Sequence, residues 1–211
     1  MKFHTRFAVG TVLALAFGLT VAASPALAEC NPDNALFEDN FEFMDVSWGE
    51  PEENFSVEDE ALLVKGWREQ VNFTTQNEGA NVCVDATVVE APKPGNSPMG
   101  LAFWWENWDN YYYVWVWPDG GLEVRRVFKG KASTVFTTET LALKKGVGET
   151  NQIELKLKPR DATIIINGTK VQRFKGIQPK DGGVIGVTAT SPSDAPATFK
   201  FDNFVVSVPD E

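Results

Sequence analysis

Hydrophobic and polar residues alternate along several short stretches of this chain. Residues 82–88 alternate apolar with polar side chains, and residues 153–157 do the same. Because a strand sends successive side chains to opposite faces, a period of two predicts strands that bury one face. No segment keeps a helical period of 3.6 over ten or more residues. The pattern therefore predicts a chain built from strands.

Turn-forming residues separate these stretches. Clusters rich in Pro, Gly, Asp and Ser recur at 92–95, 118–121, 180–183 and 191–194. Asn167-Gly168 stands between two apolar runs and predicts a tight hairpin, because both residues tolerate positive φ. Further expected strands are 61–64, 162–166, 170–174, 184–188 and 198–208. We predict an all-β fold, a two-sheet antiparallel jelly-roll sandwich, as a single domain over residues 29–211.

Large aromatic residues are concentrated in one stretch. Eight of the ten Trp and Tyr residues lie within residues 100–117, which predict two strands joined by a turn. The next strand, 122–128, can pair with 111–117 in two registers. We favour the register that sets Val114 opposite Val124, because a slip of one residue would bury Glu123 among valines. This register gives the hairpin one apolar face and one face of rings and charges.

The two faces of the hairpin have different compositions. We expect the inner face to carry Leu101, Phe103, Trp105, Tyr112, Val114 and Val116. We expect the outer face to carry Trp104, Tyr111, Tyr113, Trp115, Trp117, Glu106, Glu123 and Arg125. Such a mixture suits a saccharide, whose C–H face stacks on rings while its hydroxyls need donors and acceptors. Alternatively, the outer rings cover a second small core, which would leave Trp115 and Trp117 with low exposure.

The first 28 residues have the pattern of a signal peptide. Lys2 and Arg6 flank the start of an apolar stretch, and Ala26-Leu27-Ala28 fits a cleavage site. The apolar stretch is shorter than the about 20 residues that a membrane span needs, and no later run is long enough. We therefore predict cleavage after residue 28 and export to the periplasm or the medium, with a retained anchor as the alternative.

The charge of the chain restricts its partners. Its net charge is -10, and -12 without residues 1–28, where 17 basic residues stand against 29 acidic ones. Nucleic acid and anionic membranes are not expected as partners, because both require local Lys and Arg density. The single histidine, His4, lies in the predicted signal peptide. The mature chain therefore has no residue for a Ser-His-Asp or Cys-His mechanism or for a His-type zinc site.

The predicted mature chain has two cysteines, Cys30 and Cys83. Export and an even count favour a disulfide between them, with two unpaired thiols as the alternative. The bond would tie the N-terminal end of the mature chain to an early strand.

A series of motifs occurs in an order that resembles a known family. They are L-F-E-D-N-F at 36–41, G-L-A-F at 100–103, D-N-Y-Y at 109–112, I-N-G at 166–168, G-G-V-I-G at 182–186 and F-D-N-F at 201–204. This order, spanning nearly the whole mature chain, resembles concanavalin A-like lectin/glucanase domains. The nearest types look like laminarinase-like domains and 3-keto-disaccharide hydrolases. The resemblance implies a two-sheet jelly roll whose concave face binds glycans.

Three functions remain open from the sequence. The first is a non-catalytic, exported glycan-binding protein, whose ligand-binding residues would be Trp104, Tyr111, Tyr113, Trp115, Trp117 and Arg125. The second is a hydrolase of a glycoside or 3-keto-glycoside, with Glu106, Asp109 and Glu123 as candidate carboxylates. The E-x-D-x-E strand of laminarinase-type hydrolases is missing, however, and these acids can instead be solvated turn residues. The third is an envelope protein that binds a protein partner through the aromatic patch.

The resemblance also suggests a structural calcium ion. Asp39 near the start and Asp202 near the end could share it with backbone carbonyls, since calcium prefers oxygen ligands. Alternatively, the two acids only cap turns. No other cofactor is expected.

The disulfide leads to a first prediction. If Cys30 and Cys83 are paired, the closed loop should contribute about 4 kcal/mol to the free energy of unfolding. Urea unfolding of the mature protein, oxidised and reduced, measures that difference. A full count of two titratable thiols in the unfolded, unreduced protein would contradict the pairing.

Overall fold

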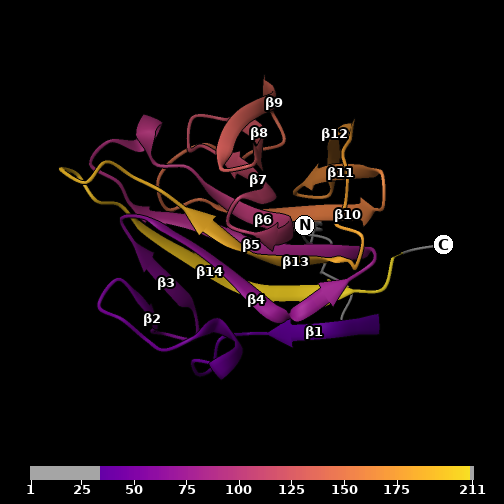
Figure 1. Cartoon of the computed structure of the whole chain (residues 1–211). Coiled ribbons are helices and arrows are strands. Elements are labelled where there is room, and N and C mark those ends of the chain that lie inside the picture. Colours follow the sequence, from indigo (N-terminus) through magenta and orange to yellow (C-terminus); the bar gives the residue numbers. More distant parts are fainter. Residues whose placement is uncertain (1–33, 210–211) are drawn as a thin grey trace, which may run out of the picture.

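The computed structural model describes residues 34–209, which form two antiparallel sheets packed face to face (Figure 1). The strands of sheet A are β1 (Ala35–Asp39), β2 (Phe55–Val57), β3 (Leu62–Lys65), β5 (Ala80–Glu90), β10 (Thr150–Lys158), β11 (Asp161–Ile166), β12 (Thr169–Lys175) and β14 (Thr198–Ser207). Their order is β12-β11-β10-β5-β14-β3-β2, and β1 also pairs with β14. The predicted signal peptide and Cys30 lie outside the described residues.

Sheet B contains the aromatic hairpin. Its strands are β4 (Arg68–Asn77), β6 (Met99–Asn107), β7 (Asn110–Val116), β8 (Gly121–Phe128), β9 (Lys131–Glu139) and β13 (Gly183–Ala189), in the order β4-β13-β6-β7-β8-β9. The described helical segments are the 3-10 turns η2 (Val46–Trp48) and η3 (Pro94–Asn96). No helix within residues 34–209 is long and apolar enough to cross a bilayer.

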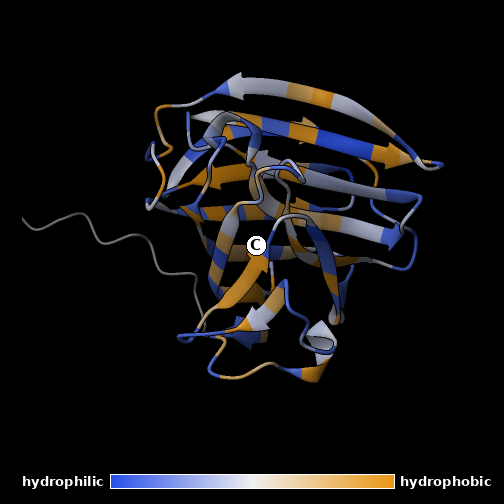
Figure 2. Ribbon diagram, turned by 90° about the vertical axis from the view of Figure 1, so that its left-hand side faces the viewer, coloured by the Kyte–Doolittle hydropathy of each residue, from blue (hydrophilic) through white to orange (hydrophobic). Residues whose placement is uncertain are grey.

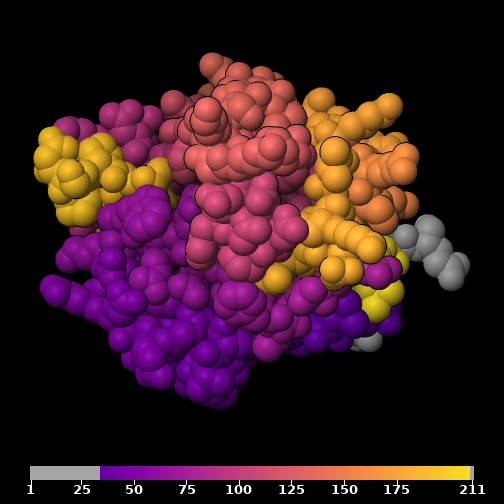
Figure 3. Space-filling view, in the orientation of Figure 1, coloured from indigo at the N-terminus to yellow at the C-terminus, as the bar shows by residue number. Residues whose placement is uncertain are grey.

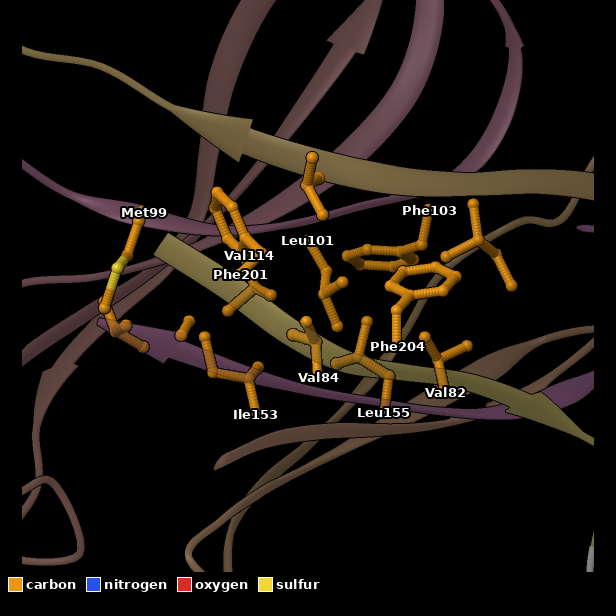
Figure 4. Packing of buried hydrophobic residues seen from close by; sticks show 14 of the residues in the cluster. Val82, Val84, Met99, Leu101, Phe103, Val114, Ile153, Leu155, Phe201 and Phe204 are labelled. Atoms are coloured by element: carbon orange, nitrogen blue, oxygen red, sulfur yellow. The ribbon is translucent and has the colours of Figure 1, made fainter. Parts of the chain in front are cut away.

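The core lies between the two sheets (Figure 4). It forms because the apolar positions of each strand share one face, as the alternating colours along the strands in Figure 2 illustrate. Sheet A contributes Val82, Val84, Ile153, Leu155, Phe201 and Phe204 to this core. Sheet B contributes Met99, Leu101, Phe103 and Val114, which pack against them. Two opposed apolar faces thus confirm the predicted all-β sandwich.

The expected strands and the tight hairpin are present. Asn167 and Gly168 join β11 to β12 with φ values of 49° and 75°, as a two-residue turn of this type requires. The strands β1, β2, β4 and β9 were not predicted from the pattern. The last two are the edge strands of sheet B, and β9 is exposed along almost its whole length. A strand that buries neither face has no reason to alternate apolar with polar residues.

The predicted register of the aromatic hairpin is confirmed. Val114 lies opposite Val124 and Val116 opposite Leu122. Val114 is 0% exposed and Val116 is 2% exposed, and both belong to the main core. The opposite face of β7, which carries Trp115, therefore looks away from the sandwich.

The predicted directions of Trp104 and Trp105 are wrong. Trp104 is only 2% exposed and packs in the main core, whereas Trp105 packs on the outer face. The cause is a β-bulge, because Trp104 has a left-handed φ of 47° and β6 has one more residue than β13 between the pairs Ala102–Gly186 and Trp105–Val184. One extra residue in a strand shifts the alternation of all that follow.

The core gives a prediction with a matched control. Leu155 is fully buried and Leu141 is 96% exposed. Leu155→Ala should lower the free energy of unfolding by about 2–5 kcal/mol, because it leaves a cavity between the sheets. Leu141→Ala should change it by less than about 0.5 kcal/mol. Urea denaturation measures both, and similar losses in the two variants would contradict this placement of the core.

Candidate functional site

The outer face of sheet B has small residues at its centre. Strand pairing sets Glu69, Thr188, Gly100, Trp115 and Glu123 side by side across β4, β13, β6, β7 and β8. The neighbouring row is Val71, Gly186, Ala102, Tyr113 and Arg125. On β13 and β6 these rows contain only Thr, Gly and Ala. The middle strands therefore leave room above them for larger side chains.

The rings of β7 occupy this room by lying across the sheet. Trp115 Nε1 donates to Thr188 Oγ1 at 3.1 Å, although β6 lies between their strands. The hydroxyl of Tyr111 donates to Glu69 Oε2 at 2.7 Å and so reaches β4, three strands away. Hydrogen bonds at the far end of both side chains hold the rings flat over the small residues.

Seven rings form a continuous ladder on this face. In order they are Phe73, Trp105, Trp108, Tyr111, Tyr113, Trp115 and Trp117. Successive ring centroids are 4.6–6.0 Å apart, within the range of favourable aromatic pairs. The ladder begins on β4, passes the end of β6 and then follows β7 along its length. We refer to these seven residues as the aromatic ladder.

Exposure differs along the aromatic ladder. Tyr111 and Tyr113 are 8% and 4% exposed and form a small buried cluster with Val127. Trp115 and Trp117 are partly exposed, and Phe73 and Trp108 reach 63% and 51%. The exposed aromatic face and the second small core, the two alternatives from the sequence, are therefore both present in part. The tyrosines make a second small core, and the tryptophans with Phe73 form a surface above it.

Glu69 is a carboxylate at the floor of this face that sequence reasoning missed. It is partly buried, and burial raises its pKa, while the hydrogen bond from Tyr111 opposes that rise. Burial, and the hydrogen bond to Glu69, raise the pKa of Tyr111 strongly, so this phenol stays protonated as a donor. The sequence did not reveal Glu69 because residues 68–77 lack the alternation of a strand with one buried face, so β4 was not predicted.

Charged groups of β8 border the ladder on the other side. Glu123 accepts a hydrogen bond from Thr134 at 2.6 Å and lies 3.7 Å from Arg125 Nε. The Arg125 guanidinium is 6.0 Å from the ring centroids of both Tyr113 and Trp115. It can therefore donate hydrogen bonds beside rings that offer stacking surface.

The three candidate carboxylates do not come together as one group. Glu106 and Asp109 are exposed at the connection between β6 and β7, where the backbone carbonyl of Asp109 accepts a hydrogen bond from Gly130 N at 3.0 Å. Glu123 lies opposite Trp115, six residues further along β7. At about 3.3 Å per residue, Glu123 and Asp109 are roughly 20 Å apart, beyond the about 5–10 Å of a catalytic pair.

The remaining predicted site residues lie in or beside sheet A. Asp39 ends β1 and accepts hydrogen bonds from Phe41 N at 2.7 Å and Trp48 Nε1 at 2.8 Å. Asp202 lies opposite Asp85 on β5. Both carboxyls have a pKa raised by burial. The calcium site stays a prediction. Cys83 is buried in β5, and its pairing with Cys30 also stays a prediction.

Comparisons with solved structures show the same sandwich. The catalytic domain of an endo-1,3-beta-glucanase (laminarinase) from Thermotoga petrophila RKU-1 superposes with a TM-score of 0.61 at 10% identity, over 84% of this chain and 98% of that one. The laminarinase from Flavobacterium sp. UMI-01 gives 0.61 at 10% identity, over 82% and 100%. The carbohydrate binding module CBM66 from Bacillus subtilis gives 0.50 at 13%, over 75% and 90%.

These similarities confirm the fold class, an antiparallel two-sheet β-sandwich of the kind seen in laminarinases. No protein-family model and no curated protein matches the sequence. Membership of the laminarinase-like or 3-keto-disaccharide hydrolase type therefore stays a prediction.

The raised pKa of Glu69 gives a prediction about stability. Between its ordinary value of 4.5 and its folded value, the folded protein keeps a proton that the unfolded chain has lost. Wild type should therefore lose stability at this residue as the pH rises through that interval. Glu69→Gln is neutral at every pH. Its free energy of unfolding, relative to that of wild type, should therefore be higher at pH 7 than at pH 4. Urea unfolding at both pH values tests this, and an unchanged or opposite difference would contradict it.

Proposed function

We propose that this protein binds a carbohydrate along the aromatic ladder. The observation that carries the proposal is the continuous series of seven rings on the outer face of sheet B. Half-exposed rings such as Trp108 and Phe73 are costly to leave in water and usually mark a binding surface. The small buried cluster beneath them holds them in place before a ligand arrives, which lowers the entropic cost of binding.

Polar groups beside the rings suit hydroxyls as ligand groups. Glu69 offers a carboxylate acceptor on one side, and Arg125 offers donors on the other. The faces of Trp115 and Trp117 offer apolar area for the C–H groups of sugar rings. A sugar is a ligand that presents both kinds of surface at once.

The length of the ladder favours a chain of sugars. From Tyr111 to Trp117 it follows six residues of strand, or about 20 Å, and its accessible rings lie on either side of the buried Tyr111 and Tyr113. Affinity should therefore increase with the number of sugar units until the ladder is filled. For one site of this kind we expect dissociation constants from micromolar to millimolar, about -4 to -8 kcal/mol.

The names of the similar structures agree with a carbohydrate ligand, since they are a glucanase and a carbohydrate binding module. The predicted signal peptide would bring the protein to the periplasm or the medium, where polysaccharides are available. We propose binding rather than hydrolysis, because Glu106 and Asp109 are exposed at the β6–β7 connection, and Glu123 lies too far along the sheet to pair with Asp109.

The tryptophans provide the test. Trp115→Ala and Trp108→Ala should each weaken oligosaccharide binding by about 10-fold or more, because single central aromatic residues often dominate an interface. Phe43→Ala is the matched control, since Phe43 is an exposed ring, 69% exposed, that lies outside the ladder. A glycan array identifies the ligand, and isothermal titration calorimetry with the mature protein measures the affinities.

Equal binding by Trp108→Ala and wild type would overturn the proposal, and so would an equal loss in the Phe43→Ala control. Melting temperatures show whether Trp115→Ala still folds. Trp108 is half exposed, so its variant tests the ladder with less change to the core.

A further inference from the structure

A cleft lies between the ends of β6, β7 and β8 and the segment 177–180 that follows β12. Its volume is about 360 Å³, room for one sugar-sized group. In Figure 3 the orange segment after β12 lies beside the pink and salmon strands. Residues lining the cleft include Trp104, Tyr112, Arg126, Phe128, Gln178 and Lys180. Apart from Tyr111, which lines its edge, this cleft contains no residue of the aromatic ladder.

Arg126 is a cation without an acidic partner. Its guanidinium lies 5.4 Å from the ring centroid of Tyr112 and 4.6 Å from that of Phe128. No carboxylate within residues 34–209 lies within 4.0 Å of it, whereas Arg68, Arg125 and Arg173 each have one. Stacking on two rings fixes the direction of the guanidinium and leaves its donors available.

Two further cations lie in or near the cleft. Lys180 lines the cleft, and the ammonium of Lys129 lies 5.3 Å from the Phe128 ring. One acid, the exposed Glu106, also lines the cleft. In a chain with a net charge of -10, a local excess of positive charge is unusual and favours an anionic group.

Two of the residues that line the cleft, Trp104 and Gln178, also have a buried polar atom without a protein partner. Trp104 is 2% exposed, and its Nε1 has no hydrogen-bond partner within the described part of the chain. The same is true of Gln178 Oε1. Buried polar atoms are nearly always paired, so an unpaired donor and an unpaired acceptor point to a polar ligand. Trp104 also has a strained left-handed backbone, a feature that concentrates at functional sites.

We propose that this cleft is a second binding site, for a sugar-sized group that carries a carboxylate or a sulfate. Arg126 and Lys180 bind the anionic group. Trp104 Nε1 and Gln178 Oε1 pair with hydroxyls, and Phe128 offers apolar area to the ring. The site is separate from the proposed glycan surface and does not depend on it.

The experiment uses four probes: glucose, glucuronate, glucose 6-sulfate and inorganic sulfate. Each is titrated into the mature protein, and the assigned indole N–H signals are followed by NMR. We expect glucuronate or glucose 6-sulfate to shift the Trp104 signal, and glucose to bind at least 10-fold more weakly, because it lacks the charge that Arg126 pairs with. Shifts with only one anionic sugar identify which anion the site takes.

The variants separate this site from general charge and from the ladder. Arg126→Gln should weaken binding of the anionic sugar about 10-fold or more, and Arg126→Lys should weaken it less. Lys65→Gln, an exposed cation on β3, makes the same charge change elsewhere and should leave binding unchanged. Trp115→Ala should leave it unchanged as well, whatever its effect on glycan binding.

Several results would overturn the inference. They are equal affinity for glucose and both anionic sugars, unchanged binding by Arg126→Gln, an equal loss in Lys65→Gln, and loss of the anionic sugar in Trp115→Ala. Binding of inorganic sulfate with no gain from the attached sugar would also overturn it, because the site would then take an ion only. Failure of neutral glycans to bind the ladder would contradict the proposed function and leave this result intact.

Discussion

The packing of one face of β7 between the two sheets is the constraint on which the rest of the structure depends. Val114 and Val116 contribute to the main core, so Tyr111, Tyr113 and Trp115 must lie on the opposite face of the same strand. Burial of the valines is favourable, and the alternative orientation would bury the charge of Glu123. The exposed aromatic surface is thus a consequence of how the core is formed.

The outer face then depends on what lies beside β7. Gly100 and Ala102 on β6 and Gly186 on β13 have little or no side chain, and this allows the rings of β7 to lie across these strands. The hydrogen bonds to Thr188 and Glu69 are the result. A Cβ atom at Gly100 would also meet the backbone carbonyl of Val114, and one at Gly186 would meet that of Gln70, so the close approach of the strands requires glycine at both positions.

The bulge at Trp104 links the two candidate sites. By adding one residue to β6 relative to β13, it turns Trp104 into the core, next to the cleft of Arg126, and turns Trp105 onto the ladder. The sequence has tryptophan at both positions, so hydrophobic alternation is the same with or without the bulge. No local signal could have distinguished the two arrangements, which differ only in the contacts that each ring makes with other strands.

The sequence by itself determined the all-β class, most of the strands, the Asn167-Gly168 turn and the register of β7 with β8, because each of these follows from local period or from the cost of burying Glu123. The tertiary structure alone decided that β4 borders β13, that Glu69 meets Tyr111, and that Phe73 begins the ladder. It also decided that the segment after β12 lines one cleft together with Arg126. Such contacts join residues far apart in the chain. They depend on which strands pair and where a bulge occurs, and a local pattern contains neither.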